Sequence, residues 1–374
     1  MEIECERMKI LVVNWRSIKD PEAGGAEVHI HEILRRLPKN FKIDFVSSTF
    51  KGCKKIKKIE NYTVYRIPNK YLFNFIFPIY WFFKLRKNNY DVVIDDISKI
   101  PLGTPLYIKN IPIIGIVHHI HAKTLFTELN PFLALYIYIM EKFMLRFYRK
   151  HKMITVSKSS KSELEELGFS DVEIVYNGVD YEPLTEFLKL KKSNEPIIIY
   201  LGRLKKYKRV DNIIKAFKIV KNEIPSAKLW IVGLGDEKDR LKKLVKDLKL
   251  NDVIFWGYVS EKEKFELLRK SWVYVICSEK EGFGISVIEA NALGTPAVGY
   301  RVSGLVDSIK DGYNGLLVEE GDITKLSETL INLLKDDDLR NRLSENAIKW
   351  AKRFSWDRSA KDFERGLGMV VNNE

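Results

Sequence analysis

The sequence predicts two α/β domains, each built on a doubly wound parallel sheet. The chain has 374 residues, whereas a single hydrophobic core stops growing at roughly 250–300 residues. Short apolar runs typical of buried parallel strands alternate along the chain with amphipathic helical segments. This alternation pauses in a polar stretch at residues 182–196 and then starts again. Such alternation favours parallel sheets that carry helices on both faces.

The first half opens with a buried strand at residues 9–15, followed by a glycine turn and a helix over residues 25–37. The lysine-rich stretch 54–58 is expected to be a solvated loop, and residues 182–196 are expected to form a linker. Further strands of the first half are predicted at residues 43–47, 63–67, 92–94, 113–117, 153–156 and 173–176.

The second half repeats this organisation. Its strands are predicted at residues 197–201, 227–232, 253–256 and 273–276, and its helices at residues 211–222, 237–248, 261–270 and 285–293. We expect domains at residues 1–182 and 183–350, and a C-terminal helix at residues 351–374 that packs back on the first domain. Because ligands of open α/β sheets bind beyond the carboxyl ends of the strands, the cleft between the domains is the expected site.

Composition narrows the class of protein. Hydrophobic residues make up 45% of the chain, which excludes an intrinsically disordered protein. A surplus of 63 Lys and Arg over 50 Asp and Glu gives a net charge of +13, which favours anionic partners. The three cysteines show no disulfide or zinc spacing. The start of the chain lacks the apolar core of a signal peptide, and no segment is long enough to span a membrane, so we expect a cytoplasmic protein.

Two aromatic stretches of the first half, residues 71–83 and 131–148, each run into a cluster of basic residues. This pattern suits helices that lie in a membrane interface, with aromatic rings at the headgroups and cations on anionic lipid. It also suits ordinary amphipathic core helices whose basic last turns complement the helix dipole. Both interpretations stay open, so peripheral contact with the cytoplasmic face of an anionic membrane is one expectation.

The strongest chemical signal is the string SEKEGFGISVIEA at residues 278–290. A strand ends just before it, its glycines allow close approach of a ligand, and a helix then begins. The free backbone N–H groups at Gly284 and Ile285 form a natural seat for phosphate. Glu281 and Glu289 can face the same pocket, where carboxylates can bind sugar hydroxyls. The alternative is that both carboxylates only stabilise the start of the helix.

This string resembles the EGFG…E motif of the retaining glycosyltransferases of family 4, which have the GT-B fold of two Rossmann-like domains facing a cleft. The resemblance implies that Glu281 lies close to the donor sugar and that Glu289 binds the ribose hydroxyls. It also implies that the first domain receives the acceptor and that the second binds a nucleotide-sugar donor. The positions close to the nucleotide base would include Tyr258, Val259 and Ser278.

A second motif extends the resemblance. Gly202-Arg203-Leu204, with Lys208 and Asp211, is similar to the family's GRL…KG…D motif, which implies that Arg203 and Lys208 hold the donor diphosphate. Arg209 stands where the family usually has glycine. Fixed cations suit this role because negative charge grows on the diphosphate as the sugar departs. The alternative for both cations is solvated surface charge.

Glycine turns carry weaker signals. Gly24-Gly25 matches the family's first-domain glycine loop, which places Gly25 near the donor phosphates and Gly24 near the acceptor. The turn at residues 232–235 resembles the family's GxG turn, and a tight strand-to-helix connection explains it equally well.

Three histidines, His118, His119 and His121, follow the strand at residues 113–117. The adjacent pair would point apart and no ligand set joins them, so a metal site is not predicted. The family places a histidine at the end of this strand near the donor sugar and acceptor, and His118 takes that place. His119 and His121 are expected near the acceptor.

The resemblance implies a reaction that moves a sugar from a UDP- or GDP-sugar to a glycan or lipid-linked acceptor, with retained anomeric configuration. No DxD motif stands at a strand end, so we expect neither a metal nor another cofactor. A sugar-nucleotide epimerase on the same fold is the alternative enzyme. A basic nucleic-acid binder is the least favoured alternative, because only the net charge supports it.

Overall fold

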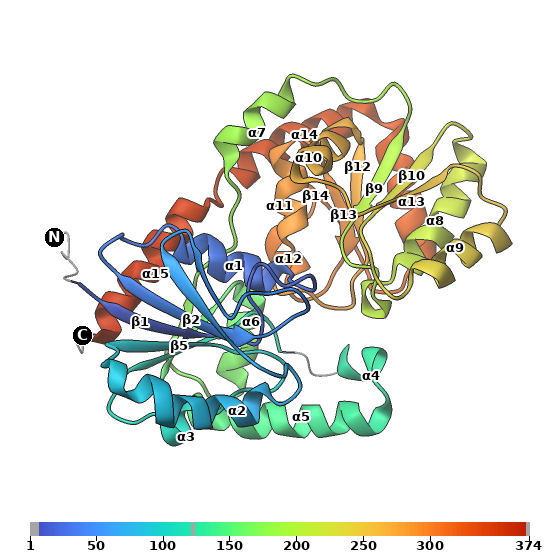
Figure 1. The fold of residues 1–374 in the computed structure, drawn as a ribbon. Helices are drawn as coiled ribbons and strands as arrows, with labels where there is room; N and C mark the ends of the chain where they lie inside the picture. The colour runs from blue at the N-terminus through green and yellow to red at the C-terminus, as the bar shows by residue number, and fades with distance from the viewer. Residues whose placement is uncertain (1–6, 121–123, 372–374) are drawn as a thin grey trace. The chain divides into compact units, whose positions relative to one another are not determined.

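The computed structural model describes residues 7–120 and 124–371 (Figure 1). The chain divides into two compact units. The first contains residues Met1–Leu125, Leu129–Asn177 and Trp356–Glu374, and the second contains Phe126–Glu128 and Gly178–Ser355. Each unit is built on its own α/β sheet, so the predicted class of two doubly wound domains is confirmed. The roles assigned to residues 1–182, 183–350 and 351–374 stay predictions.

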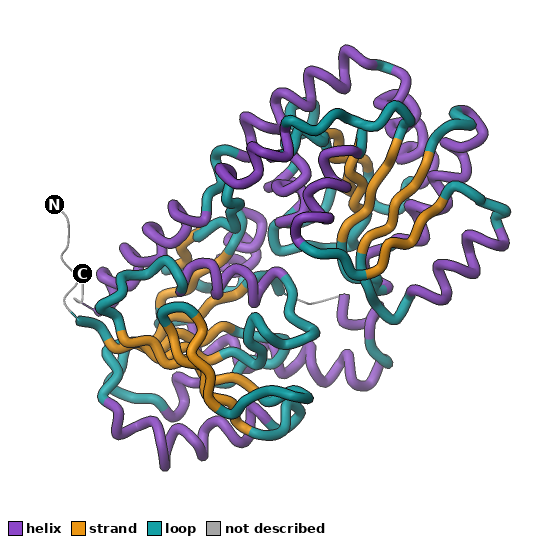
Figure 2. Tube along the Cα trace, turned by 45° about the horizontal axis from the view of Figure 1, so that its top comes forward, coloured by secondary structure: helices purple, strands orange, loops and turns teal. Residues whose placement is uncertain are grey.

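The sheet of the first unit has the strand order β3-β4-β2-β1-β5-β6-β7-β8. Only β3 runs antiparallel to its neighbour, and it corrects the expected loop at residues 54–58. Figure 2 shows these strands side by side in orange. Their bounds are β1 (Lys9–Val13), β2 (Lys42–Ser48), β3 (Ile56–Ile59), β4 (Tyr62–Ile67), β5 (Val92–Asp96), β6 (Ile113–Val117), β7 (Lys152–Thr155) and β8 (Val172–Ile174).

Helices cover both faces of this sheet. One face packs against α1 and the C-terminal α15, whose Phe363 and Leu367 are fully buried in the core of the unit. The other face packs against α2, α3 and α5 (Figure 1). The helical segments of the unit are α1 (Gly25–Leu34), α2 (Phe73–Tyr80), a π-helical turn η1 (Trp81–Leu85), η2 (Arg86–Asn88), α3 (Thr104–Tyr107), α5 (Pro131–Leu145), η3 (Arg146–Tyr148), α6 (Lys158–Glu166) and α15 (Trp356–Val371). A short α4 (Thr124–Glu128) is shared between the two units.

The sheet of the second unit is parallel throughout, in the order β11-β10-β9-β12-β13-β14. Its strands are β9 (Ile197–Leu201), β10 (Lys228–Val232), β11 (Val253–Gly257), β12 (Val273–Ile276), β13 (Ala297–Tyr300) and β14 (Gly315–Val318). Its helices are α7 (Tyr181–Leu188), η4 (Lys206–Lys208), α8 (Val210–Glu223), α9 (Lys238–Asp247), α10 (Glu261–Lys270), α11 (Ile285–Ala292), α12 (Leu305–Ser308), α13 (Ile323–Lys335) and α14 (Asp337–Ala351). Helix α7 corrects the expectation that residues 182–196 are only a linker.

Both sheets contain a topological switch point, where consecutive connections leave the first strand of the sheet in opposite directions. In the first unit the switch lies between β1 and β5, and in the second it lies between β9 and β12. Ligands of open α/β sheets bind beyond the carboxyl ends of the strands at such a point. None of the helices within residues 7–120 and 124–371 is long and apolar enough to cross a bilayer.

Candidate active site

The switch point of the second unit brings two predicted site residues into direct contact. Lys208 ends η4, which follows β9, and Glu281 lies in the turn between β12 and α11. The ammonium of Lys208 forms an ion pair with Glu281 Oε1, and the same oxygen accepts a hydrogen bond of 2.6 Å from Ser278 Oγ. Burial disfavours the charged ammonium, but the neighbouring Glu281 carboxylate outweighs burial and raises the pKa of Lys208. Lys208 is therefore charged at neutral pH.

The second predicted carboxylate, Glu289, also has a cationic partner. Lys264 on α10 forms an ion pair of 2.7 Å with Glu289 on α11, and it contacts Glu261 at 2.8 Å. The side chains of Lys264 and Glu289 are only 13% and 17% exposed, respectively. Burial opposes the charge of Lys264, but Glu289 and Glu261 outweigh it and raise its pKa. Lys264 thus fixes the carboxylate of Glu289, which is the fifth residue of α11.

The turn that carries Glu281 keeps its shape through close backbone packing. The Glu281 N–H donates to the Ser303 carbonyl at 3.1 Å. A Cβ atom at Gly304 would lie 2.2 Å from the Glu281 carbonyl oxygen, so only glycine fits there. A Cβ atom at Gly233 would likewise lie 2.0 Å from the Gly202 carbonyl oxygen. Gly233, the first glycine of the turn at residues 232–235, therefore has a structural role. Its backbone packs closely against the turn that carries Arg203.

Arg209, which stands where the family usually has glycine, adopts a left-handed conformation with φ of 48°. Glycine favours this conformation, so the local loop keeps the shape that glycine would give it. The guanidinium of Arg209 forms an ion pair of 3.2 Å with Glu279 and approaches Asp211 at 3.5 Å. These contacts hold the strained residue and connect the loop after β9 to the loop after β12.

The other predicted donor-site residues lie at the same end of the second sheet. Arg203 is exposed and follows β9. Its positive charge acts to lower the pKa of Lys208, against the larger effect of Glu281. Gly284 and Ile285 form the start of α11, where Gly284 has φ of 85°. Tyr258, which is 83% exposed, and Val259 follow β11, two strands away from β9. The structure thus brings Lys208, Glu281 and Ser278 together and does not join Tyr258 or Val259 to them by a described contact.

In the first unit, the predicted catalytic residue His118 follows β6, next to the switch point between β1 and β5. Its Nε2 lies 2.9 Å from Asp96 Oδ1 at the end of β5. Asn14, which follows β1, donates from Nδ2 to the other Asp96 oxygen. Because a carboxylate only accepts hydrogen bonds, Nε2 of His118 is the donor in this contact.

A buried histidine packs against His118 on its other side. The ring of His29 lies at a centroid distance of 5.1 Å from the His118 ring, in an edge-to-face arrangement. His29 is fully buried, and its Nε2 donates to the Val175 carbonyl at 3.0 Å. Burial, together with the charge of His118, lowers the pKa of His29 to about 3. His29 is therefore neutral at physiological pH and contributes no charge beside His118.

The remaining predictions for the first unit concern the glycine loop and the histidine cluster. Gly25 begins α1, and the Gly24 N–H donates to Glu27 Oε2 at 2.7 Å. His119 is half-buried beside His118. His121 lies outside the described residues. These residues stay candidates for contact with the donor phosphates and acceptor.

Several residues of the two sites were not predicted from the sequence, namely Asn14, His29, Asp96, Lys264 and Glu279. A signal for Asn14 and Asp96 does exist. They stand at the carboxyl ends of β1 and β5, which are neighbours in the sheet. No comparable signal identifies Lys264, which lies 25 positions before Glu289 on another helix.

Within the described part of the chain, no three His, Cys, Asp or Glu side chains are grouped so that they could hold a metal ion. Metal independence stays a prediction.

Replacing Lys264 with methionine should raise the KM for the donor ~10–100-fold with a smaller change in kcat. Loss of a hydrogen-bonded charge near Glu289 costs about 1.5–3 kcal/mol, and a ribose contact remote from the reacting bond acts mainly on binding. Steady-state kinetics would measure both constants. Lys262→Met, at an exposed position on the same helix, is the matched control. A kcat loss as large as the KM change would contradict a role at the ribose.

Comparison with known proteins identifies the family of the chain. Residues 23–183 match the family described as Glycosyltransferase Family 4, and residues 183–350 match Glycosyl transferases group 1. A glycosyltransferase of uncharacterised activity from Methanocaldococcus jannaschii is 27% identical over 391 aligned positions, which cover 97% of this chain and 100% of that protein.

Two further proteins are similar. The N-acetyl-alpha-D-glucosaminyl L-malate synthase of Bacillus anthracis is 37% identical over 202 residues, 51% of this chain and 52% of that enzyme. The match therefore spans about half the length of that relative. A crystal structure of HepE from Anabaena in complex with UDP-glucose superposes with a TM-score of 0.76 at 18% identity, covering 97% of this chain and 100% of that chain.

The fold and these matches define a glycosyltransferase of GT-B fold that uses a nucleotide-sugar donor. The chain belongs to the family 4, or group 1, glycosyltransferases. The predicted family, fold class and enzyme class are confirmed.

Proposed function

We propose that the chain transfers a sugar, with retained anomeric configuration, from a UDP- or GDP-sugar to a glycan or lipid-linked acceptor. The observation that carries the proposal is the half-buried ion pair between Lys208 and Glu281 at the switch point of the second sheet. An ammonium in this position, beside the start of α11, provides a fixed cation where a Rossmann-like domain receives phosphate.

The leaving group of the reaction is a nucleoside diphosphate, so the site must stabilise charge that grows on phosphate oxygens. Lys208 and Arg203 supply cations, and the backbone N–H groups of Gly284 and Ile285 supply donors at the start of α11. An incoming diphosphate replaces Glu281 as the partner of Lys208. The Glu281 carboxylate, still held by the Ser278 hydroxyl, then accepts hydrogen bonds from hydroxyls of the donor sugar.

The other carboxylate of α11 serves the nucleoside. Glu289, fixed by Lys264, accepts hydrogen bonds from the ribose hydroxyls, as acidic residues do in other dinucleotide-binding folds. The first unit contributes His118 near the acceptor, where Asp96 and Asn14 orient its ring. In retaining transfer by front-face substitution, the leaving phosphate helps to deprotonate the acceptor, and His118 acts as a positioning group.

A UDP-sugar is our first choice of donor, because the Anabaena protein of similar fold is in complex with UDP-glucose. The expected test result is thermal stabilisation by UDP but not by ADP, with GDP as the second choice. A ligand at 100 times its Kd stabilises the folded protein by about 2.7 kcal/mol, which raises Tm by roughly 2–4 °C in a protein of this size.

The same measurement on Lys208→Ala should show no nucleotide-dependent shift, whereas Lys205→Ala should keep it. Lys205 lies on the same loop, but it pairs with the exposed Asp236 at 3.0 Å. A lack of stabilisation by all three nucleotides would contradict the proposed donor site. Proton NMR of the product then tests retention, because an inverted anomeric coupling is incompatible with the proposed mechanism.

A further inference from the structure

Two helical segments of the first unit are apolar on both sides. Each segment has one row of side chains buried on the sheet, and further large apolar side chains face away from it. The buried row on the α2–η1 segment recurs every four residues, as Phe73, Phe77, Trp81 and Leu85. The buried row on α5 consists of Ala134, Ile137, Glu141 and Leu145.

Helix α3 lies between these two segments. The Tyr107 ring of α3 contacts Phe77 of α2 at a centroid distance of 6.4 Å. The side chain of Met144 on α5 packs against Gly103, directly before α3. Figure 1 shows all three helices on one face of the sheet. Their outward sides therefore form a continuous surface, which we call the aromatic face.

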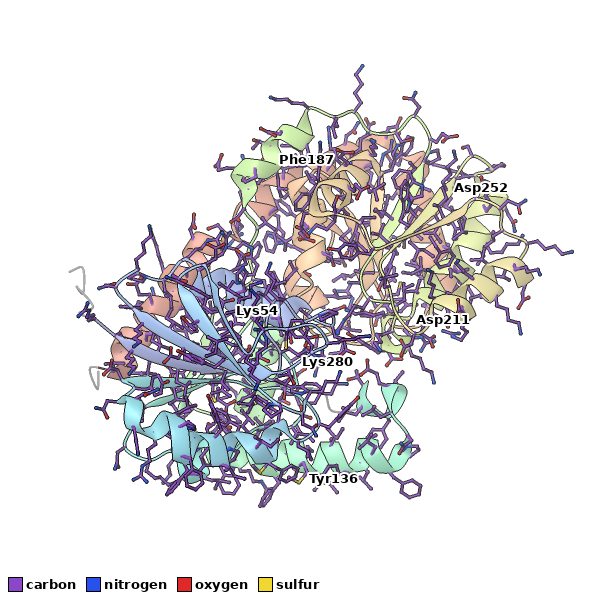
Figure 3. The ribbon with its side chains drawn as sticks, in the orientation of Figure 1. Lys54, Tyr136, Phe187, Asp211, Asp252 and Lys280 are labelled. Atoms are coloured by element: carbon purple, nitrogen blue, oxygen red, sulfur yellow. The ribbon has the colours of Figure 1, made fainter. Side chains whose placement is uncertain are left out.

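The aromatic face holds most of the exposed apolar bulk of the described structure. Twelve of the 23 large hydrophobic side chains that are exposed in the described residues lie on its two outer segments or directly before the first of them. They are Tyr71, Leu72, Phe75, Ile79, Phe82, Phe83, Phe132, Leu133, Leu135, Tyr136, Ile139 and Phe143. Leu106 on α3 is also exposed. Figure 3 shows Tyr136 on the side of α5 that points away from the sheet. Exposed apolar surface of this extent marks an interaction site.

The exposed charges on the same segments are all positive. Residues 71–90 contain no acidic residue, and Glu141, the one acidic residue of residues 131–150, is buried. The exposed cations are Lys84, Arg86, Lys87, Lys142, Arg146, Arg149 and Lys150. Two of them lie directly over rings, Arg86 at 5.3 Å from Phe82 and Lys142 at 4.5 Å from Tyr138. The partner of this face must therefore accept both aromatic rings and cations.

Cations in and directly after α5 also line a hollow at the C-terminal end of this helix. Lys142, Arg146 and Arg149 surround it, and its apolar lining comes from Leu145, Leu167 and Phe169. Three cations and three apolar side chains around one hollow match a phosphate headgroup that is joined to an acyl chain. A folded acidic protein would meet the cations but offers no reason for so many exposed apolar side chains.

We propose that the aromatic face docks on an anionic phospholipid bilayer, with its rings at headgroup level and its cations on lipid phosphates. Helices that lie in a membrane interface combine these two features. The protein would then bind to the membrane surface without crossing it. This inference concerns the first unit only and does not depend on the donor or acceptor of the proposed reaction.

Vesicle co-sedimentation tests the proposal. We expect the full chain to bind vesicles of equal parts phosphatidylglycerol and phosphatidylcholine at least ~10-fold more tightly than vesicles of phosphatidylcholine alone. High salt should weaken this binding, because the Debye length falls to about 3 Å at 1 M. Equal binding to both kinds of vesicle, or no binding to either, would overturn the proposal.

Paired variants test the two parts of the face. Phe75→Ser with Phe132→Ser, at 69% and 87% exposed positions, should abolish most of the vesicle binding. Ile56→Ser, at a 60% exposed position on β3, is the control. Arg86→Gln with Lys87→Gln should weaken binding ~30-fold, since each cation near an anionic surface contributes about 1 kcal/mol. Lys57→Gln with Lys58→Gln, two exposed lysines of β3, should have little effect.

Light scattering distinguishes the bilayer from a second copy of the chain. If the wild type is a dimer that Phe75→Ser with Phe132→Ser converts to a monomer, the face is a self-association surface and the proposal is wrong. Stabilisation by UDP, measured on the same variants, should stay at the wild-type level. A failure of vesicle binding can therefore be told apart from a failure of the proposed donor site.

Discussion

Replacing Lys208 with alanine is expected to lower kcat ~100–1000-fold while the protein stays folded. Loss of one preorganised donor to a developing anion typically costs this much. Lys208 is positioned for that role because it already holds a carboxylate at the start of α11 and its raised pKa keeps it charged. Donor hydrolysis and sugar transfer should both fall, since both reactions release the same diphosphate.

The variant also leaves Glu281 half-buried without its cation, which is expected to cost about 1–3 kcal/mol of stability. A double variant, Lys208→Met with Glu281→Gln, should recover much of this stability without recovering turnover. Circular dichroism and thermal unfolding measure the stability, and Lys205→Ala is the matched control for activity. Hydrolysis and transfer near wild-type rates in Lys208→Ala would show that the diphosphate binds elsewhere.

Acid should destabilise the first unit through His29. The pKa of this histidine is about 3 in the folded protein, against an ordinary value of 6.5. Between these values the unfolded chain binds a proton that the folded protein excludes, so stability is lost as the pH falls from 6.5 towards 3. The difference corresponds to about 5 kcal/mol at the acid end of this window. Above pH 6.5 the group has no effect.

Urea unfolding of wild type and His29→Gln at a series of pH values measures this contribution as the difference between the two proteins. Glutamine keeps an N–H donor for the Val175 carbonyl but does not titrate. The two proteins must be compared at each pH because Asp95 also titrates in this range. Burial raises the pKa of Asp95 to about 6, so this group increases the stability of the folded protein as the pH falls. A half-buried neighbour variant, His31→Gln, should change the pH dependence less. If His29→Gln shows the wild-type dependence on pH, another group accounts for it.

The sequence predicted what depends on local pattern. The alternation of apolar strands with amphipathic helices depends on neighbouring residues, and it correctly predicted both sheets, which are parallel except at β3. Edge elements were harder, because β3 carries three lysines in and beside its four residues and resembles a loop by composition. Helix α7 was hidden by the prolines and charges of the surrounding stretch. Strand β3 depends on its pairing with β4, and α7 packs against α10 through Phe187 and Phe265.

The candidate site divides in the same way. Motifs that join a strand end to a helix start, such as the turn before Gly284, are continuous in sequence and could be recognised. Ion pairs between separate elements could not, because Lys264 is placed beside Glu289 only by the packing of α10 on α11. Arg209 is a further case. Its left-handed backbone conformation is unfavourable for arginine, and contacts with Glu279 and Asp211 hold it there.

The return of α15 to the first unit affects how the protein is made on the ribosome. Phe363 and Leu367 complete a core whose other members come mainly from residues 8–175. That core therefore stays open until the second unit has been synthesised, which takes roughly 10–35 s at about 5–20 residues per second. The second unit is almost continuous in sequence and can fold during this time. The half of the protein that is translated first is thus the half that finishes folding last, and its sheet is the surface that a nascent-chain chaperone would need to protect.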